Sequence, residues 1–178
     1  MSYINYYENL PKGWALTTLS AAGNWKSGST PDRNNSHYYN GTMPWIKTGE
    51  LNDNTFLDKS QEHVTEKALK ECSLPINAIG NVLVAMYGAT IGRLAINQVP
   101  VVTNQACCGC TIYNGMYNKY LFYYLLANRK NLTELGAGGA QPNISKEKIQ
   151  AFPYLLPPYN EQVRIVTRIQ CLFNVIKQ

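Results

Sequence analysis

The sequence lacks a long apolar segment. No run in its 178 residues approaches the roughly 20 apolar residues that a membrane-spanning helix needs. The first seven residues, Met1 to Tyr7, contain neither a basic start nor an apolar stretch, so they predict no secretory signal peptide. We therefore expect a cytoplasmic protein with no membrane partner.

Ligands for a metal site are scarce. The chain has only two histidines, His37 and His63. Three of its five cysteines lie close together, as Cys107, Cys108 and Cys110. A structural zinc site usually needs a second pair of ligands with two or more residues between its members, and that pair is missing. We therefore predict no metal site, and we interpret the three cysteines as part of a buried strand whose small thiols point inward.

Signatures of catalysis are missing or incomplete. Leu156-Pro157-Pro158-Tyr159 is similar to the Pro-Pro-aromatic tetrapeptide of amino-methyltransferases, but Leu156 cannot accept a hydrogen bond from a target amino group. The glycine-rich stretch from Gly136 to Gln141 follows an expected helix and not a strand, which is the wrong context for dinucleotide binding. The chain has no Walker lysine motif, no acid followed two positions later by a lysine, and no serine elbow. We predict a binding protein that is not an enzyme and uses no cofactor.

Acidic residues are absent from Cys72 to Thr133, a stretch of 62 residues that carries four cations. By contrast, the segment from Glu50 to Glu71 holds six acids. A surface without acids can approach phosphates without repulsion, and a few lysines or arginines then supply the attraction. The uneven charge indicates a face that binds nucleic acid. Core strands, which carry few charges, would give the same pattern, and both explanations can hold together.

The residues that are present suit one packed domain. Hydrophobic residues make up 45% of the chain and charged residues 15%, and the length fits one ordinary domain. Together the predicted elements indicate an α+β fold with a mixed, mainly antiparallel sheet and peripheral helices. Short apolar segments predict strands at 15–19, 43–49, 81–87, 93–96, 106–112 and 152–156. Helical spacing and capping residues predict helices at 65–70, 118–135, 145–150 and from 160 to the end.

The last predicted helix has the apolar spacing of a coiled-coil seam. Its apolar residues recur four, three and four positions apart, as Ile165, Ile169, Leu172 and Ile176. Two repeats are too few for a stable isolated coiled coil. We expect the helix either to pack on a partner or to continue into a longer helix. An ordinary helix docked on its own domain is the alternative.

Several short motifs follow one another in a characteristic order from about Leu10 to Gln178. They are 28–31 (GSTP) with 44–51 (PWIKTGEL), 85–92 (AMYGATIG), 103–108 (TNQACC), 138–145 (GGAQPNIS), and 156–158 (LPP) with 161–162 (EQ) and 164–166 (RIV). In this order and spacing they resemble the DNA-specificity (S) subunit of type I restriction–modification enzymes. Each motif is weak alone, and the full ordered set is specific.

The resemblance implies a subunit without a catalytic centre. Such subunits usually carry two target-recognition domains, joined by long helices that set the distance between two half-sites on double-stranded DNA. They dock adenine methyltransferase subunits and recruit a motor-nuclease subunit. On this interpretation, residues 1–156 form one DNA target-recognition domain, and residues 157–178 begin the coiled-coil spacer helix. The chain is then a fragment, or a half-length subunit that self-associates through its C-terminal helix, and its end at Gln178 favours a fragment or a truncated product.

The expected DNA contacts flank breaker-rich loops, strand ends and the glycine-rich stretch. Arg93 is the main candidate, because it is the only charge between Cys72 and Lys119. Asn104 and Asn143 can equally well satisfy backbone groups of turns, and we expect Trp45 in the core and not as a platform for bases. The predicted DNA-binding residues are Lys26, Ser29, Thr30, Arg33, Lys47, Tyr87, Thr90, Arg93, Asn104, Gln105, Gln141, Asn143 and Lys146.

Two other functions remain open at this stage. Recognition domains of this kind also occur fused to catalytic domains, so the chain could be a fragment of a single-chain DNA methyltransferase. Alternatively, it could be a docking module that binds a protein through its Ile/Leu helix and does not bind DNA by itself.

Overall fold

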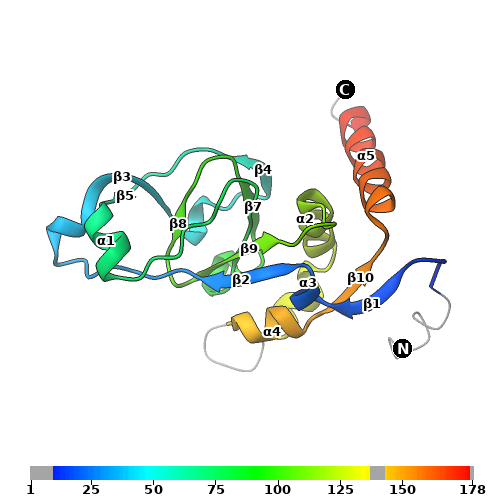
Figure 1. The fold of residues 1–178 in the computed structure, drawn as a ribbon, viewed down its shortest axis with the longest axis horizontal. Helices are drawn as coiled ribbons and strands as arrows, with labels where there is room; N and C mark the ends of the chain where they lie inside the picture. Colours follow the sequence, from blue (N-terminus) through cyan, green and yellow to red (C-terminus); the bar gives the residue numbers. More distant parts are fainter. Residues whose placement is uncertain (1–9, 137–142, 177–178) are drawn as a thin grey trace.

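The computed structural model describes residues 10–136 and 143–176, which form three β-sheets and five α-helices. Figure 1 shows an elongated arrangement, with the smaller three-stranded sheet towards one end and the C-terminal helix projecting at the other. Most strand pairs are antiparallel, and two are parallel. The predicted mixed, mainly antiparallel α+β fold is confirmed.

A five-stranded sheet forms the centre of the molecule. Its strands, in spatial order, are β2 (Gly23–Ser27), β9 (Cys107–Ile112), β6 (Val82–Ala85), β7 (Leu94–Asn97) and β4 (Asn54–Leu57). β6 and β7, which lie within or near the strands predicted at 81–87 and 93–96, form an antiparallel hairpin around Gly88–Gly92, with Val82 opposite Ile96. The tight turn is possible because Gly88 and Gly92 both adopt a positive φ, which is unstrained for glycine.

Two smaller sheets flank the central one. The three-stranded sheet has the order β5 (His63–Val64), β3 (Tyr39–Ile46) and β8 (Val102–Thr103). β3 begins earlier than the predicted strand and also ends earlier. It ends at Ile46 because the Glu50 carboxylate accepts from the Lys47 backbone N–H at 2.9 Å and closes a short 3₁₀ turn, Thr48–Glu50. The third sheet pairs β1 (Ala15–Thr18) with β10 (Pro153–Leu156), which are distant in sequence.

The helices lie around the sheets. They are α1 (Glu66–Glu71), α2 (Asn118–Ala127), α3 (Arg129–Glu134), α4 (Lys146–Ala151) and α5 (Tyr159–Ile176). Two predicted caps are present: Thr65 accepts from the Ala68 N–H, and Ser145 accepts from the Lys148 N–H. The predicted cap at residue 160 is wrong, because α5 begins at Tyr159.

The prediction of one continuous helix over residues 118–135 is wrong. The chain breaks at Asn128, between α2 and α3. The Asn128 side-chain amide donates to the Tyr124 carbonyl oxygen at 2.9 Å, and the Asn128 backbone N–H donates to the same oxygen. Asparagine competes in this way for backbone acceptors, which is why it is a poor residue for a helix interior.

The main core lies between the central sheet and the helices. Leu121, Phe122 and Leu125 of α2 are buried against Val82, Val84 and Ile96 of the sheet. The predicted cysteine strand is confirmed, because Cys107, Cys108 and Cys110 are buried in β9. Burial raises the pKa of the Cys108 thiol to about 12 and also raises the pKa values of the other two thiols.

Candidate nucleic-acid interface

Three segments that are distant in sequence meet beside the three-stranded sheet. The Ser29 backbone N–H donates to the Thr103 carbonyl oxygen, and the Asn104 N–H donates to the Ile46 carbonyl oxygen, both at 3.0 Å. These contacts join segments 28–33, 45–47 and 103–105. Six predicted DNA-contacting residues therefore lie in one region. We call these six residues, together with Glu62, the polar cluster. The six are Ser29, Thr30, Arg33, Lys47, Asn104 and Gln105.

Arg33 is the most constrained cation of the polar cluster. Its guanidinium carbon lies 4.6 Å from the ring centroid of Trp45 and 4.8 Å from that of Tyr39. Its two terminal nitrogens donate to the two oxygens of Glu62, at 2.5 Å and 3.5 Å. The hydrogen bond to Glu62 raises the pKa of Arg33 above its ordinary value. Two rings and a carboxylate therefore hold this side chain, although half of it remains exposed.

Glu62 joins the two cations of the polar cluster. Its second partner is the Lys47 ammonium group, 2.5 Å from Oε1. Hydrogen bonds from Arg33 and then Lys47 hold the pKa of the Glu62 carboxyl below its ordinary value, so the carboxylate is charged at neutral pH. Both cations of the polar cluster, Arg33 and Lys47, are therefore paired with Glu62.

Uncharged polar groups complete the polar cluster. The Thr30 hydroxyl donates to the side-chain oxygen of Gln105, whose side chain is exposed. The side-chain oxygen of Asn104 is buried and has no hydrogen-bond partner in the part of the chain that the structure describes. The Asn104 backbone carbonyl, and not its side chain, closes the local turn by accepting from the Cys107 N–H at 3.0 Å.

A second group of predicted residues surrounds the Gly88–Gly92 turn. Tyr87 forms a bridge with Asn143, and the Ile144 N–H donates to the Met86 carbonyl oxygen at 2.9 Å. The Thr90 hydroxyl donates to the Tyr87 carbonyl oxygen at 3.4 Å. The turn between β6 and β7 and the end of the glycine-rich stretch therefore lie together.

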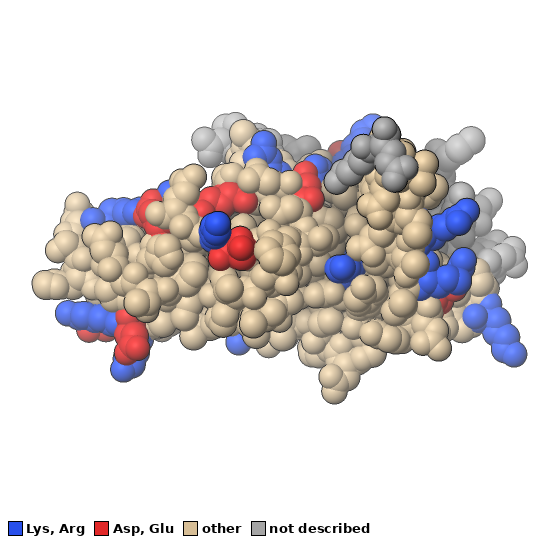
Figure 2. Space-filling view, turned by 90° about the horizontal axis from the view of Figure 1, so that it is seen from above, with Lys and Arg blue, Asp and Glu red and all other residues tan. Residues whose placement is uncertain are grey.

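The remaining predicted cations differ in their pairing. Arg93, which follows the turn, and Lys26 on β2 are exposed and form no ion pair with other described residues. Lys146 lies 3.6 Å from Glu147 at the start of α4. Gln141 lies outside the described residues. Figure 2 shows one face on which lysines and arginines are scattered over a largely uncharged surface, with acidic residues beside some of them.

The seam residues of the C-terminal helix have unequal environments. In the first turns of α5, Gln162 and Val166 are buried, and Ile165 and Ile169 are partly buried. The Gln162 side chain accepts from the Tyr117 N–H at 2.9 Å and donates to the carbonyl oxygens of Gly115 and Pro157. This part of α5 is docked on its own chain.

The last turns of α5 leave apolar side chains exposed. Leu172 and Ile176, the outer half of the predicted seam, are 52% and 78% exposed. Phe173 and Val175 beside them are exposed as well. Figure 1 shows this end of the helix projecting away from the sheets.

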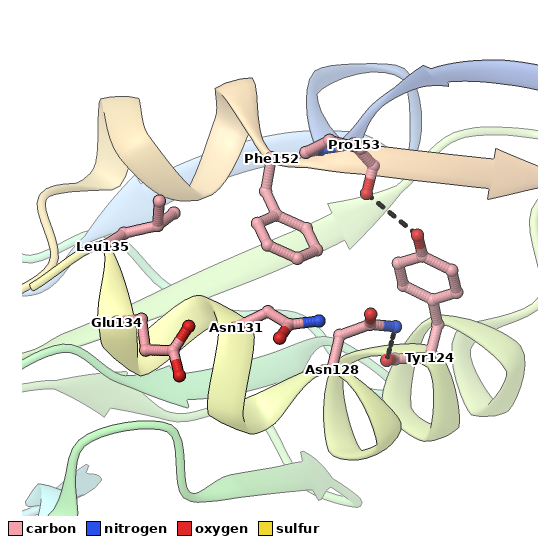
Figure 3. Close-up of a pocket in the computed structure, with 7 residues that line it drawn as sticks. All are labelled: Tyr124, Asn128, Asn131, Glu134, Leu135, Phe152 and Pro153. Carbon is pink, nitrogen blue, oxygen red and sulfur yellow. Dashed lines mark hydrogen bonds between the residues drawn. The ribbon is translucent and has the colours of Figure 1, made fainter. Parts of the chain in front are cut away.

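A separate cleft of about 320 Å³ lies where α2, α3 and the start of β10 meet. Figure 3 shows the Phe152 ring from one side and the Asn131 amide from the other pointing into it. The Tyr124 hydroxyl donates to the Pro153 carbonyl oxygen at 2.9 Å. Its lining residues are Tyr124, Asn128, Asn131, Glu134, Leu135, Phe152 and Pro153.

The described ranges contain neither a cluster of metal ligands nor a membrane-spanning helix. Within residues 10–136 and 143–176, no three His, Cys, Asp or Glu side chains lie in a group that could hold a metal ion. None of the helices in these ranges is both long and apolar enough to cross a membrane.

Comparison with known proteins identifies the family. Residues 11–178 match the type I restriction modification DNA specificity domain. The chain belongs to this family. It is 28% identical over 172 residues to the MjaIX type I restriction enzyme specificity subunit of Methanocaldococcus jannaschii, covering 94% of this chain and 40% of that protein. It is also 28% identical over 155 residues to the EcoR124I/EcoR124II specificity subunit of Escherichia coli, covering 84% of this chain and 38% of that protein.

The fold of this specificity-domain chain is also found in a solved structure. The crystal structure of the HsdS subunit from Thermoanaerobacter tengcongensis superposes with a TM-score of 0.76 at 19% identity. The alignment covers 96% of this chain and 40% of that subunit. The chain thus spans about two fifths of the length of these relatives.

Sequence reasoning missed two residues of the candidate interface of this specificity domain. Glu62 lies in the acidic segment from Glu50 to Glu71, and it pairs with Arg33 and Lys47. Tyr39 is the second missed residue: its ring contacts Arg33, and the sequence did not predict this contact. Trp45 is in the core as predicted, with 1% of its surface exposed, and its ring also contacts Arg33. The motif around Trp45 pointed to this region, but no local pattern identifies Glu62 as the partner of a residue 29 positions earlier.

Proposed function

We propose that this chain is a target-recognition domain that reads one half of a bipartite DNA target for a type I restriction–modification system. On this proposal, residues 1–156 bind double-stranded DNA and residues 157–178 begin the spacer helix. The domain performs no chemistry and directs adenine methylation or cleavage by methyltransferase and motor-nuclease subunits. Because its target is cellular DNA, we place it in the cytoplasm.

The polar cluster is the observation that carries this proposal. Hydrogen bonds bring Ser29, Thr30 and Gln105 together although they come from two motifs that are about 75 positions apart in the sequence. Amide, hydroxyl and guanidinium groups are the side chains that contact base edges and phosphates. The family membership supports the same function, since the relatives are named as specificity subunits.

Selection from a random duplex pool tests the proposal directly. The purified chain is incubated with the pool, and the enriched duplexes are sequenced. Binding of the enriched duplex and of a scrambled control is then measured at two salt concentrations. We expect a short enriched motif, tighter binding of that motif than of the scrambled control, and weaker binding of both duplexes at high salt as phosphate contacts are screened. Equal binding of enriched and scrambled duplexes would contradict sequence recognition.

The exposed end of α5 supports a second role, which is docking. We propose that Leu172 and Ile176 pack against another helix, either in a second copy of this chain or in a longer subunit. Apolar side chains at this spacing form the seam of a coiled coil. Their exposure leaves apolar surface that association would bury.

Sedimentation measurements test this role. We expect the wild-type chain to self-associate with rising concentration, and Leu172→Glu to remain monomeric, because a charge in the seam would be buried without a partner. Thr167→Glu, at an exposed polar position of the same helix, is the matched control and should associate like the wild type. A wild-type chain that stays monomeric at all concentrations would argue against self-association.

A further inference from the structure

The cations of the candidate interface are of two kinds. Lys26 and Arg93 have no ion-pair partner among the residues that the structure describes, whereas Arg33 and Lys47 share the carboxylate of Glu62. Attraction to phosphate is electrostatic and needs an excess of positive charge. Glu62, with Glu50 hydrogen-bonded to the Lys47 backbone, offsets the two paired cations. The polar cluster is therefore poorly suited to phosphate attraction.

The contacts with Glu62, Tyr39 and Trp45 leave Arg33 suited to a hydrogen-bonded contact of defined geometry. A guanidinium group has five N–H donors in a fixed plane. Glu62 receives hydrogen bonds from the two terminal nitrogens, and no described residue accepts from Nε. Half of the side chain is exposed. A fork made of Nε and a terminal N–H is therefore not occupied by any described residue.

The surroundings of Arg33 restrict its motion before any ligand binds. Contact with Trp45 and Tyr39 fixes where the guanidinium lies, and the carboxylate of Glu62 fixes its rotation. A side chain that is ordered in advance loses less conformational entropy on binding. Such order is more valuable for a contact that must discriminate by geometry than for a point attraction to phosphate.

An uncharged group of the polar cluster suits the same kind of partner. Gln105 presents an exposed amide whose oxygen accepts from Thr30, which leaves its N–H donors available. Hydrogen-bond donors and acceptors without net charge match base edges, whose pattern carries the sequence.

We propose that Arg33, held by Glu62 and the rings of Tyr39 and Trp45, reads a guanine of the DNA target, and that the unpaired cations Lys26 and Arg93 contact phosphates. The Arg33 fork would donate to guanine O6 and N7, the commonest specific contact between a side chain and a base. This inference rests on the proposed function and adds to it the base class that is read and the residue that reads it.

Selection and binding with three variants test the assignment. Arg33→Lys keeps the charge but removes the fork, and Glu62→Gln removes the carboxylate that orients it. We expect each variant to lose the preference for guanine at one position of the enriched motif. The binding ratio between the wild-type motif and a duplex changed at that guanine should fall by roughly 10- to 100-fold. The control Lys26→Gln should weaken binding to both duplexes alike and keep the motif.

The outcomes separate the inference from the function on which it rests. A wild-type chain that enriches no motif contradicts both. A motif that keeps its guanine in Arg33→Lys and in Glu62→Gln contradicts the inference alone. If Glu62→Gln instead binds all duplexes more tightly and with a steeper salt dependence, Glu62 masks phosphate-binding cations and the assignment is wrong.

A folding control accompanies these variants. Far-ultraviolet circular dichroism and the unfolding midpoint establish that each variant is native. If Arg33→Lys does not fold, Gln105→Glu replaces it, because the Gln105 side chain is exposed. That variant exchanges amide donors for an acceptor in the polar cluster. It should alter the selected base at one position, and an unchanged motif would contradict the inference.

Discussion

Gly28 occupies a position where another segment leaves no room for a side chain. An added Cβ would fall inside van der Waals contact with the Thr103 carbonyl oxygen and the Asn104 carbonyl oxygen, which are backbone atoms. Backbone atoms cannot move aside as the end of a flexible side chain can. Gly28 therefore allows the close approach that assembles the polar cluster.

Gly28→Ala should destabilise the protein because the crowded backbone must shift. We expect the free energy of unfolding to fall by about 1–3 kcal/mol, the usual cost of an added methyl group in a packed site. Urea denaturation with linear extrapolation measures the change. Gly49→Ala is the matched control, since an added Cβ there meets nothing within 4 Å. Equal stability of the two variants would show that the close approach at Gly28 is relaxed in solution.

The five thiols should differ in reactivity according to burial. Cys107, Cys108 and Cys110 are buried, and burial raises the pKa of Cys108 to about 12. At pH 8 these thiols are protonated and inaccessible, whereas the thiolate is the reactive form. Cys171 is exposed and Cys72 is partly exposed. With a chromogenic disulfide reagent we expect at most two thiols to react in the native protein and five in denaturant. Fast native reaction of a third thiol would contradict the buried strand.

At the scale of helices and strands, the sequence correctly predicted features that depend on neighbouring residues. The hairpin of β6 and β7 followed from β-branched apolar segments around a glycine turn, and α4 followed from its Ser145 cap. The break at Asn128 was missed because the apolar spacing continues across it. The pairing of β1 with β10 joins residues about 140 positions apart. It was not predicted, because neither strand has a sequence pattern that identifies the strand with which it pairs.

Gln162 should be essential for the attachment of α5. It is 1% exposed and hydrogen-bonds the Tyr117 N–H and the carbonyl oxygens of Gly115 and Pro157. Gln162→Leu leaves these groups without partners, at a cost of about 1–3 kcal/mol for each group that stays buried. Thermal and urea unfolding should both show the loss. Arg168→Ala, exposed on the same helix, should leave stability nearly unchanged, and a Gln162→Leu variant as stable as the wild type would contradict this anchoring role.

At the scale of the whole molecule, charge distribution was only partly visible in the sequence. The segment free of acids made Arg93 the main candidate for DNA contact; Arg93 is exposed and has no ion pair with the described residues, and its contact with DNA stays a prediction. The pairing of Arg33 and Lys47 with Glu62 was not visible, because ion pairs across 29 and 15 positions depend on the tertiary fold. The ordered motifs could therefore nominate residues of the candidate interface, but the sequence could not say which of them lie together or which cations are paired with acids.

This distinction predicts how DNA binding responds to the loss of Arg93. If Arg93 contacts a phosphate, Arg93→Ala should weaken binding to all duplexes similarly, and the slope of log affinity against log salt should decrease by about one. Titrations of an enriched and a scrambled duplex over a range of salt concentrations measure both effects.

Lys59→Ala provides the matched control for Arg93→Ala. Lys59 is also exposed, and its removal changes the net charge equally, but it lies in the acidic segment. A long-range effect of net charge would weaken binding in both variants to the same extent, whereas a local phosphate contact affects Arg93→Ala alone. If both variants lose the same affinity, Arg93 does not contact DNA directly. The lost affinity then reflects electrostatic attraction by the molecule as a whole.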